Sequence, residues 1–187
     1  NLPFVKNIFI QPASNDVGTA IGAALEVTNS IGENADFVMT YAYWGEEFSN
    51  TEIEKVLSGA KVSFKKVKNV EKLTADKLNQ GRIVAWFQGR SEIGPRALGN
   101  RSILAHPALL GIKDKINKEV KHRENWRPFA PSILHEFGNT YFENYISSPF
   151  MLLTFKTKGE KVRDISQAIH IDQTARVQSV TKAANPR

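Results

Sequence analysis

The sequence predicts a mixed α/β fold, with α+β as the alternative. Short apolar runs typical of strands alternate with helix-like segments along the chain. The 187 residues are 41% hydrophobic, which is compatible with a packed core. The chain has no cysteine, which rules out disulfides and thiolate metal sites. No apolar run approaches the ~20 residues of a membrane span, and no secretory signal is visible, so we expect a cytoplasmic protein.

The first part of the chain indicates a strand at residues 7–11, a turn, and a helix over residues 17–27 with Asp16 as its N-cap. One strand and one helix cannot form a core by themselves. We therefore expect residues 1–28 to be an edge element or the tail of a neighbouring domain, and residues 29–187 to form the main domain.

The main domain is expected to begin with strands at residues 37–44 and 62–67. Between them, Ser49 and Glu52 form a capping box that starts a helix, and Gly59 is a suitable C-cap. A short helix at residues 74–80 and a buried strand at residues 82–87 follow.

The second half of this domain contains a helix expected to start at Pro107 and to end before Pro128. Ile112, Ile116 and Val120 recur every four residues, which predicts a stripe of core residues on this helix. Two further strands are expected at residues 130–134 and 151–155.

Residues 89–102 read GRSEIGPRALGNRS and place Arg90, Arg96 and Arg101 among glycines directly after the buried strand. The stretch can be a surface loop with solvated arginines. It can also be an anion-binding loop, because glycines let the backbone approach a ligand and guanidinium groups bind phosphate oxygens. It lacks the Gly-Lys-Ser/Thr end of a Walker A loop.

Two more polar clusters allow two interpretations each. Lys121, Arg123 and Arg127 follow a helix, where they can interact with its dipole or form a second wall of a cationic pocket. If residues 170–178 form a strand, His170, Asp172, Thr174, Arg176 and Gln178 point to one side. That side can be a solvated edge or can recognise a polar ligand. The remaining histidines, His106, His122 and His135, lack metal-ligand spacing.

The net charge of +6 and the pI of about 9.5 favour an anionic partner, which can be nucleic acid, a membrane surface or a small molecule. Six of the nine arginines lie between Arg82 and Arg127, which favours a local anion site over dispersed surface charge. The aromatic residues do not alternate with basic ones as they do in RNA-stacking modules, which argues against nucleic acid.

Four segments together carry a family resemblance: residues 12–25 (PASNDVGTAIGAAL), 86–107 (WFQGRSEIGPRALGNRSILAHP), 120–134 (VKHRENWRPFAPSIL) and 170–180 (HIDQTARVQSV). The chain resembles the C-terminal part of the O-carbamoyltransferases that modify nodulation factors and antibiotics such as tobramycin, cephamycin and novobiocin. The resemblance implies a YrdC-like module, with a twisted mixed sheet and flanking helices, that makes carbamoyl-adenylate from carbamoyl phosphate and ATP with Mg²⁺. A Kae1-like module of the actin/Hsp70 superfamily then transfers the carbamoyl group to a hydroxyl acceptor such as a sugar, an antibiotic or a nodulation factor.

In this resemblance residues 1–28 correspond to the end of the Kae1-like module and residues 29–187 to a YrdC-like module truncated at its C-terminus. Members of the family continue beyond residue 187 into an Asn-Thr-Ser-Phe-Asn segment, so we expect the chain to be a fragment that is inactive alone. The alternative is a non-catalytic anion-binding or RNA-binding module of the YrdC type.

Site roles follow from matching motif to motif. The resemblance implies catalytic roles for Arg96, Arg101, His170 and Arg176. It implies substrate or nucleotide binding by Arg90, Glu92, Ser102, Lys121, Arg123, Arg127, Ser132 and Gln178. Asp16 matches an aspartate that helps to hold Fe²⁺ or a similar metal in the transferase module, whose histidine ligands lie outside this chain. We therefore expect no metal site formed by this chain alone.

Overall fold

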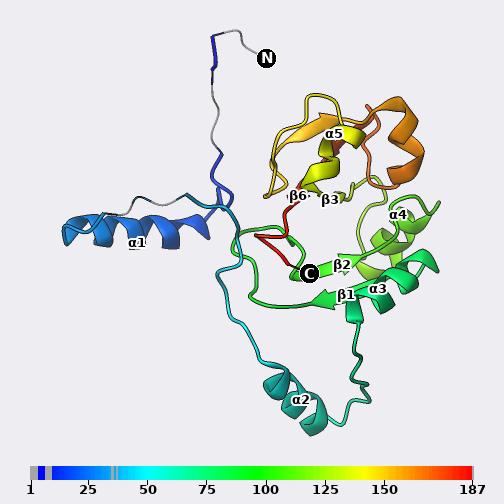
Figure 1. Cartoon of the computed structure of the whole chain (residues 1–187), viewed down its shortest axis with the longest axis horizontal. Helices are drawn as coiled ribbons and strands as arrows, with labels where there is room; N and C mark the ends of the chain where they lie inside the picture. The colour runs from blue at the N-terminus through cyan, green and yellow to red at the C-terminus, as the bar shows by residue number, and fades with distance from the viewer. Residues whose placement is uncertain (1–3, 7–9, 35, 37, 187) are drawn as a thin grey trace.

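The computed structural model describes residues 4–6, 10–34, 36 and 38–186. Its first three helices are α1 (Gly18–Ser30), α2 (Asn50–Gly59) and α3 (Val70–Asn79), and none of them contributes a buried residue. Figure 1 shows α1 and α2 standing apart from the strands. Within the described residues, no helix has the length and apolar character needed to cross a membrane.

The strands pair two by two, and the mixed α/β class is confirmed. β1 (Val84–Phe87) and β2 (Arg101–Leu104) are antiparallel, with Val84 opposite Leu104. β3 (Ser132–Leu134) runs parallel to β6 (Gln178–Val180). β4 (Thr154–Lys156) and β5 (Thr174–Arg176) are antiparallel. Among the described residues, these pairs form three two-stranded sheets and not one continuous sheet.

Short helical segments connect the strands. α4 (Ile112–Lys115) continues into the π-helix η1 (Ile116–Val120), and η2 (His135–Phe137) precedes α5 (Gly138–Tyr141). The 3₁₀ segment η3 (Gly159–Ile165) lies between β4 and β5.

The helix expected from Pro107 therefore begins later, after the turn at Gly111, whose φ of 79° lies in the left-handed region. Ile112 and Ile116 are buried as expected, but Val120 is exposed. A π-helix turn contains more residues than an α-turn, so the four-residue spacing no longer keeps Val120 on the buried face.

Two hydrophobic clusters form the core. The larger one lies in the C-terminal part and contains Phe142, Tyr145, Phe155, Ile165, Ala175 and Val177. The smaller one contains Ala42, Leu98 and Met151, so a residue of the arginine-rich loop packs against the segment before α2. The arginine-rich loop is therefore anchored in a hydrophobic cluster through Leu98 and is not fully solvated.

Several predicted elements differ from the structure. Residues 62–67 form no strand. In the expected strand at residues 37–44, Phe37 lies outside the described residues, and residues 38–44 contribute only an isolated bridge between Tyr43 and Glu92. Both predictions relied on local apolar patterns, and a strand also needs a partner to hydrogen-bond with. In the expected strand at 7–11, residues 7–9 lie outside the described residues, and Ile10 and Gln11 are not in a strand.

Capping residues explain where α2 and α3 begin. The capping box is confirmed, because Ser49 Oγ accepts from Glu52 N–H and the Glu52 carboxylate accepts from Ser49 N–H. Asn69 caps α3, which therefore starts earlier than residue 74. The predicted caps Asp16 and Gly59 are wrong. Val17 is the N-cap of α1 with no side-chain cap bond, and Ala60 is the C-cap of α2.

Candidate anion-binding site

A cavity of about 280 Å³ brings together residues from β2, β3, β5, β6, the loop after β1 and the turn after η1. The predicted site residues that line it are Arg96, Ser102, Lys121, Arg123, Ser132, Arg176 and Gln178. We call this space the cationic cavity. Its remaining walls include Phe129 and Met151.

Among the described residues, no acidic side chain lines the cationic cavity. None of its four cations, Arg96, Lys121, Arg123 and Arg176, forms an ion pair with any carboxylate in the described part of the chain. The Nε atoms of Arg96 and Arg176 are buried and have no hydrogen-bond partner there. Burial, and then the charge of Arg96, lowers the pKa of Arg176 below its ordinary value. Gathering such charges is costly unless an anion joins them, so the cavity is suited to a phosphate or carboxylate ligand.

Arg123 is held in place by Asn117, a residue that the sequence reasoning did not select. Asn117 is completely buried, and its Oδ1 accepts from Arg123 Nε at 2.7 Å. Its Nδ2 donates to the carbonyls of Asn125 and Arg127 at 3.3 and 3.0 Å. Arg123 also lies over the Phe129 ring, 4.9 Å from its centroid. The only sequence signal was an amide beside the core residue Ile116.

The pKa of Arg123 is lowered by burial and then by the charge of Arg127. Both effects disfavour the charged form of the guanidinium. A bound anion would offset them, as it would for Arg176. Arg123 and Arg176 therefore both favour a bound anion, although they come from different segments of the chain.

Glu92 organises the loop that carries Arg96. One oxygen of its carboxylate, Oε1, accepts from the backbone N–H groups of Leu98 at 2.7 Å, Asn100 at 2.8 Å and Arg101 at 3.2 Å. The loop also turns at Gly94 and Gly99, whose φ angles of 100° and 108° are left-handed and suit glycine. Glu92 therefore shapes the loop from within and is not among the residues lining the cationic cavity.

The carbonyl of Leu98 is held by donors from two distant segments. Gln178 Nε2 donates to it at 2.6 Å and Tyr43 Oη at 2.8 Å. Ser132 Oγ in turn donates to Gln178 Oε1 at 2.7 Å. The loop is thereby tied to β3 and β6, which fixes one edge of the cationic cavity. Tyr43 was also missed from the sequence, because nothing local links it to Leu98.

Other predicted site residues lie outside the cationic cavity. Arg101 stacks on Phe87, with its guanidinium carbon 3.5 Å from the ring centroid, and donates to the carbonyls of Gln88 and Gly89. Arg90 is exposed and lies 3.7 Å from the Glu47 carboxylate. Arg127 is exposed and lies 3.9 Å from Glu124.

His170 lies in the turn before β5, where its Nδ1 is 2.9 Å from Thr174 Oγ1. The expectation of one strand over residues 170–178 is wrong, because Gln173 has a left-handed φ of 63° and only residues 174–176 and 178–180 are strands. His170 and Arg176 are therefore not on a common strand face. Asp16 is exposed, and the described residues contain no group of three His, Asp or Glu that could hold a metal.

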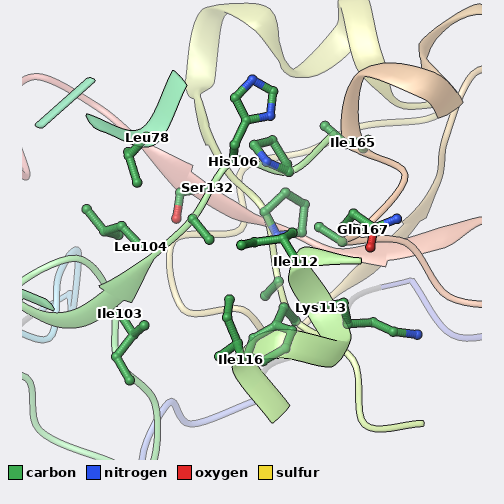
Figure 2. A pocket seen from close by; sticks show the side chains of 16 residues that line it. Leu78, Ile103, Leu104, His106, Ile112, Lys113, Ile116, Ser132, Ile165 and Gln167 are labelled. Carbon is green, nitrogen blue, oxygen red and sulfur yellow. The ribbon is translucent and has the colours of Figure 1, made fainter. Parts of the chain in front are cut away.

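A second cavity of about 280 Å³, shown in Figure 2, adjoins the cationic one. We call it the apolar pocket. It is lined chiefly by aliphatic side chains, with His106, Lys113 and Gln167 among its few polar ones. The two cavities share Ile103, Leu104, Phe129, Ala130 and Ser132 as walls. They therefore lie side by side along β2.

Comparisons with known proteins agree over most of the chain. Residues 75–187 match the family described as carbamoyltransferase C-terminus. The chain is 40% identical over 187 residues to nodulation protein NolNO of Sinorhizobium fredii, covering 96% of this chain and 28% of that protein. It is 40% identical over 187 residues to nodulation protein NolO of Bradyrhizobium diazoefficiens, covering 96% of this chain and 34% of that protein.

The chain is also 35% identical over 185 residues to 3'-hydroxymethylcephem-O-carbamoyltransferase of Amycolatopsis lactamdurans, covering 97% of this chain and 33% of that protein. The chain thus spans about a third of the length of these relatives. The similarity includes residues on both sides of the expected boundary at residue 28, since nearly all of the chain is aligned.

Proposed function

Since this chain belongs to the carbamoyltransferase C-terminus family, we propose that it is part of an O-carbamoyltransferase whose cationic cavity binds the phosphate groups of carbamoyl phosphate and ATP. One observation carries this proposal: Arg96, Lys121, Arg123 and Arg176 line one cavity with no ion-pair partner among the described residues. Both ligands are polyanions, and guanidinium forks match their oxygens.

The chemistry proposed for this cavity is the formation of carbamoyl-adenylate. Carbamoyl phosphate first loses its phosphate to water, which leaves carbamate. A carbamate oxygen then attacks the α-phosphorus of ATP, the bond to the β-phosphate breaks, and pyrophosphate leaves. Mg²⁺ enters with ATP and offsets part of its charge. Charge on the phosphoryl oxygens is stabilised by cations held in place before the reaction, here Arg96 and Arg176 with Lys121 and Arg123.

Buried contacts support a preorganised site. Arg123 is fixed by Asn117, and the Arg96 loop is fixed by Glu92 and Gln178. Cations that need no rearrangement stabilise a transition state more effectively than mobile ones. In this proposal Arg90, Arg101, Arg127 and His170 are not required for phosphate binding, because they lie outside the cavity.

We propose that residues 29–187 are the YrdC-like adenylate-forming module and that residues 1–28 end a Kae1-like transferase module. The acceptor is a small molecule with a hydroxyl group, consistent with a relative whose name specifies 3'-hydroxymethylcephem. Asp16 would contribute to an iron site only together with that module. A side chain at Gly94 would place its Cβ 3.4 Å from the Pro12 carbonyl oxygen and 3.5 Å from the Ala13 Cβ, and this proximity supports contact between the two parts. The reaction is assigned to the cytoplasm, where ATP is made.

Calorimetric titration with carbamoyl phosphate and with pyrophosphate tests the site. Arg176→Ala should weaken binding of both ligands by about 10-fold or more, because a charge-assisted hydrogen bond contributes about 1.5–3 kcal/mol. Arg82→Ala is the matched control, since Arg82 is exposed and lies outside the cavity. It should leave both affinities unchanged. Absence of binding, or equal loss in both variants, would overturn the proposal.

Two further readouts separate the reaction from simple anion binding. Pyrophosphate release from ATP should depend on carbamoyl phosphate when the complete enzyme is assayed, and Arg176→Ala should abolish it. RNA binding whose affinity falls linearly with the logarithm of salt concentration, without nucleotide binding, would instead identify an RNA-binding module.

A further inference from the structure

A separate cavity of about 350 Å³ lies between the end of β1, the start of α2 and residues 184–186. We call it the polar cavity. Its volume falls within the range of about 300–1,000 Å³ that is typical of small-molecule sites. It shares no lining residue with the cationic cavity or with the apolar pocket, so it can hold a ligand of its own.

Side-chain amides supply much of the polar surface of this cavity. Gln88 Nε2 donates to Asn100 Oδ1 at 3.1 Å and to Asn185 Oδ1 at 3.3 Å, and Asn185 Nδ2 donates to Asn100 Oδ1 at 3.0 Å. These bonds fix the three amides relative to one another. Gln88 is only 9% exposed, yet its Oε1 has no hydrogen-bond partner among the described residues. Buried polar atoms of this kind are rare in folded proteins, so this acceptor indicates a missing donor.

The polar cavity carries little net charge, in contrast to the cationic cavity. Of the described residues that line it, only Glu47 is ionised at neutral pH, and its carboxylate lies 3.7 Å from Arg90 Nε. Tyr43 stays neutral, because burial raises the pKa of its phenol above the ordinary value. A phosphate or carboxylate would find no cation in this lining. A neutral ligand with several hydroxyl groups matches the donors and acceptors of the amides better.

Two aromatic rings provide an apolar surface beside the amides. The ring centroids of Phe48 and Phe87 are 6.2 Å apart, and the two residues are 45% and 54% exposed. The negative face of an aromatic ring attracts the slightly positive C–H groups of a saturated ring. A pyranose presents such C–H groups on its faces and hydroxyl groups around its edge. It therefore matches both the aromatic surface and the amides.

We propose that the polar cavity is a saccharide-binding site that takes one pyranose ring, either as a free sugar or as one unit of a larger saccharide. The ring packs on Phe48 and Phe87, and its hydroxyl groups form hydrogen bonds with Asn50, Gln88 and Asn185. This site goes beyond the proposed function and does not depend on it, because the polar cavity and the cationic cavity have no lining residue in common.

Saturation-transfer difference NMR on the 187-residue chain tests this site with uncharged probes. Methyl β-D-glucopyranoside supplies a single sugar ring, cellobiose supplies a pair of linked rings, and cyclohexanol supplies a ring of the same size with a single hydroxyl group. Both sugars should receive saturation, and cyclohexanol should receive little. Equal affinity for the two sugars would identify a single-ring ligand, and tighter binding of cellobiose would identify a larger saccharide. Absence of transfer to both sugars, or equal transfer to cyclohexanol, would overturn the proposal.

Matched variants locate the sugar in the polar cavity. Phe48→Ala and Asn50→Ala should each weaken binding of methyl β-D-glucopyranoside about 5-fold, since each removes a proposed contact with the ring or its hydroxyl groups. Phe64→Ala and Asn79→Ala make the same changes at exposed positions outside the cavity, and they should leave the affinity unchanged. Equal effects within both matched pairs would refute the assignment.

Chemical shifts of the unaltered chain give a test that does not depend on the folding of a variant. In proton–nitrogen correlation spectra, methyl β-D-glucopyranoside should shift the side-chain NH₂ signals of Asn50, Gln88 and Asn185 and leave the backbone signals of Lys121 and Arg123 in place. Pyrophosphate should produce the opposite pattern. Sugar-induced shifts confined to the cationic cavity would contradict the saccharide site. Failure of pyrophosphate to bind would overturn the phosphate site and leave the saccharide site standing.

Discussion

Replacement of Glu92 tests how the Arg96 loop is held. In Glu92→Ala the backbone N–H groups of Leu98, Asn100 and Arg101 lose their shared acceptor. Leu98 and Asn100 are only 4% and 5% exposed, so water cannot readily replace the carboxylate. An unsatisfied buried donor costs about 1–3 kcal/mol, which gives about 2–6 kcal/mol for these two donors. That loss is a large fraction of the stability of a typical domain.

Glu92→Gln separates hydrogen bonding from charge. The glutamine Oε1 can still accept from the same donors, but neutral hydrogen bonds are roughly half as strong as charge-assisted ones. We expect this variant to lose about 1–2 kcal/mol of unfolding free energy, clearly less than the alanine variant.

Urea unfolding followed by circular dichroism measures these differences. Glu136→Ala is the control, because Glu136 is exposed and should change stability by less than about 0.5 kcal/mol. The order of stability should be control, then Glu92→Gln, then Glu92→Ala. A Glu92→Ala midpoint equal to that of the control would refute the loop-organising role, and equal losses for both Glu92 variants would refute the hydrogen-bond explanation.

Two other residues give separate predictions. Asn117→Ala removes a fully buried amide with three hydrogen bonds, so it should lower the unfolding free energy measured by urea titration by about 2–4 kcal/mol. The same variant should weaken pyrophosphate binding, because Arg123 loses the side chain that holds it. An unchanged urea midpoint would contradict this role. Burial raises the pKa of Tyr43 above its ordinary value of 10.0. The contribution of Tyr43 to the free energy of unfolding is therefore fully present below pH 10 and is lost as the pH rises through the folded-state pKa. The stability advantage of the wild type over Tyr43→Phe should shrink in urea titrations above pH 10, and a difference that stays constant would argue against a buried neutral phenol.

Two local sequence signals predicted local structure correctly. The capping box at Ser49 and Glu52 formed as expected, because both partners lie within one helical turn. The strand before the arginine-rich loop also formed, somewhat shorter than predicted. The strands predicted from the apolar runs at residues 37–44 and 62–67 did not form among the described residues, since a strand depends on a partner that the local pattern does not contain.

For the candidate site too, the sequence predicted some features and the tertiary structure decided others. The sequence left each of the three polar clusters open between an ordinary structural role and ligand binding, and the family resemblance favoured ligand binding. It could not separate Arg96, which lines the cavity, from Arg101, which binds loop carbonyls a few residues away. The directions of the Arg96 and Arg101 side chains depend on the hydrogen bonds of Glu92, the ring of Phe87 and the pairing of β1 with β2. The positions of charged residues along the sequence do not reveal these contacts.

The sequence by itself determined the family, the mixed α/β class and the excess of positive charge in the loop and turn segments. Tertiary structure alone decided that Arg96 and Arg176, far apart along the chain, share one cavity without a counter-charge. It also decided that Asn117 and Gln178 hold that cavity in shape. The physical reason is that composition and periodicity record neighbours along the chain. Burial, ion pairing and the loss of hydration depend on neighbours in space.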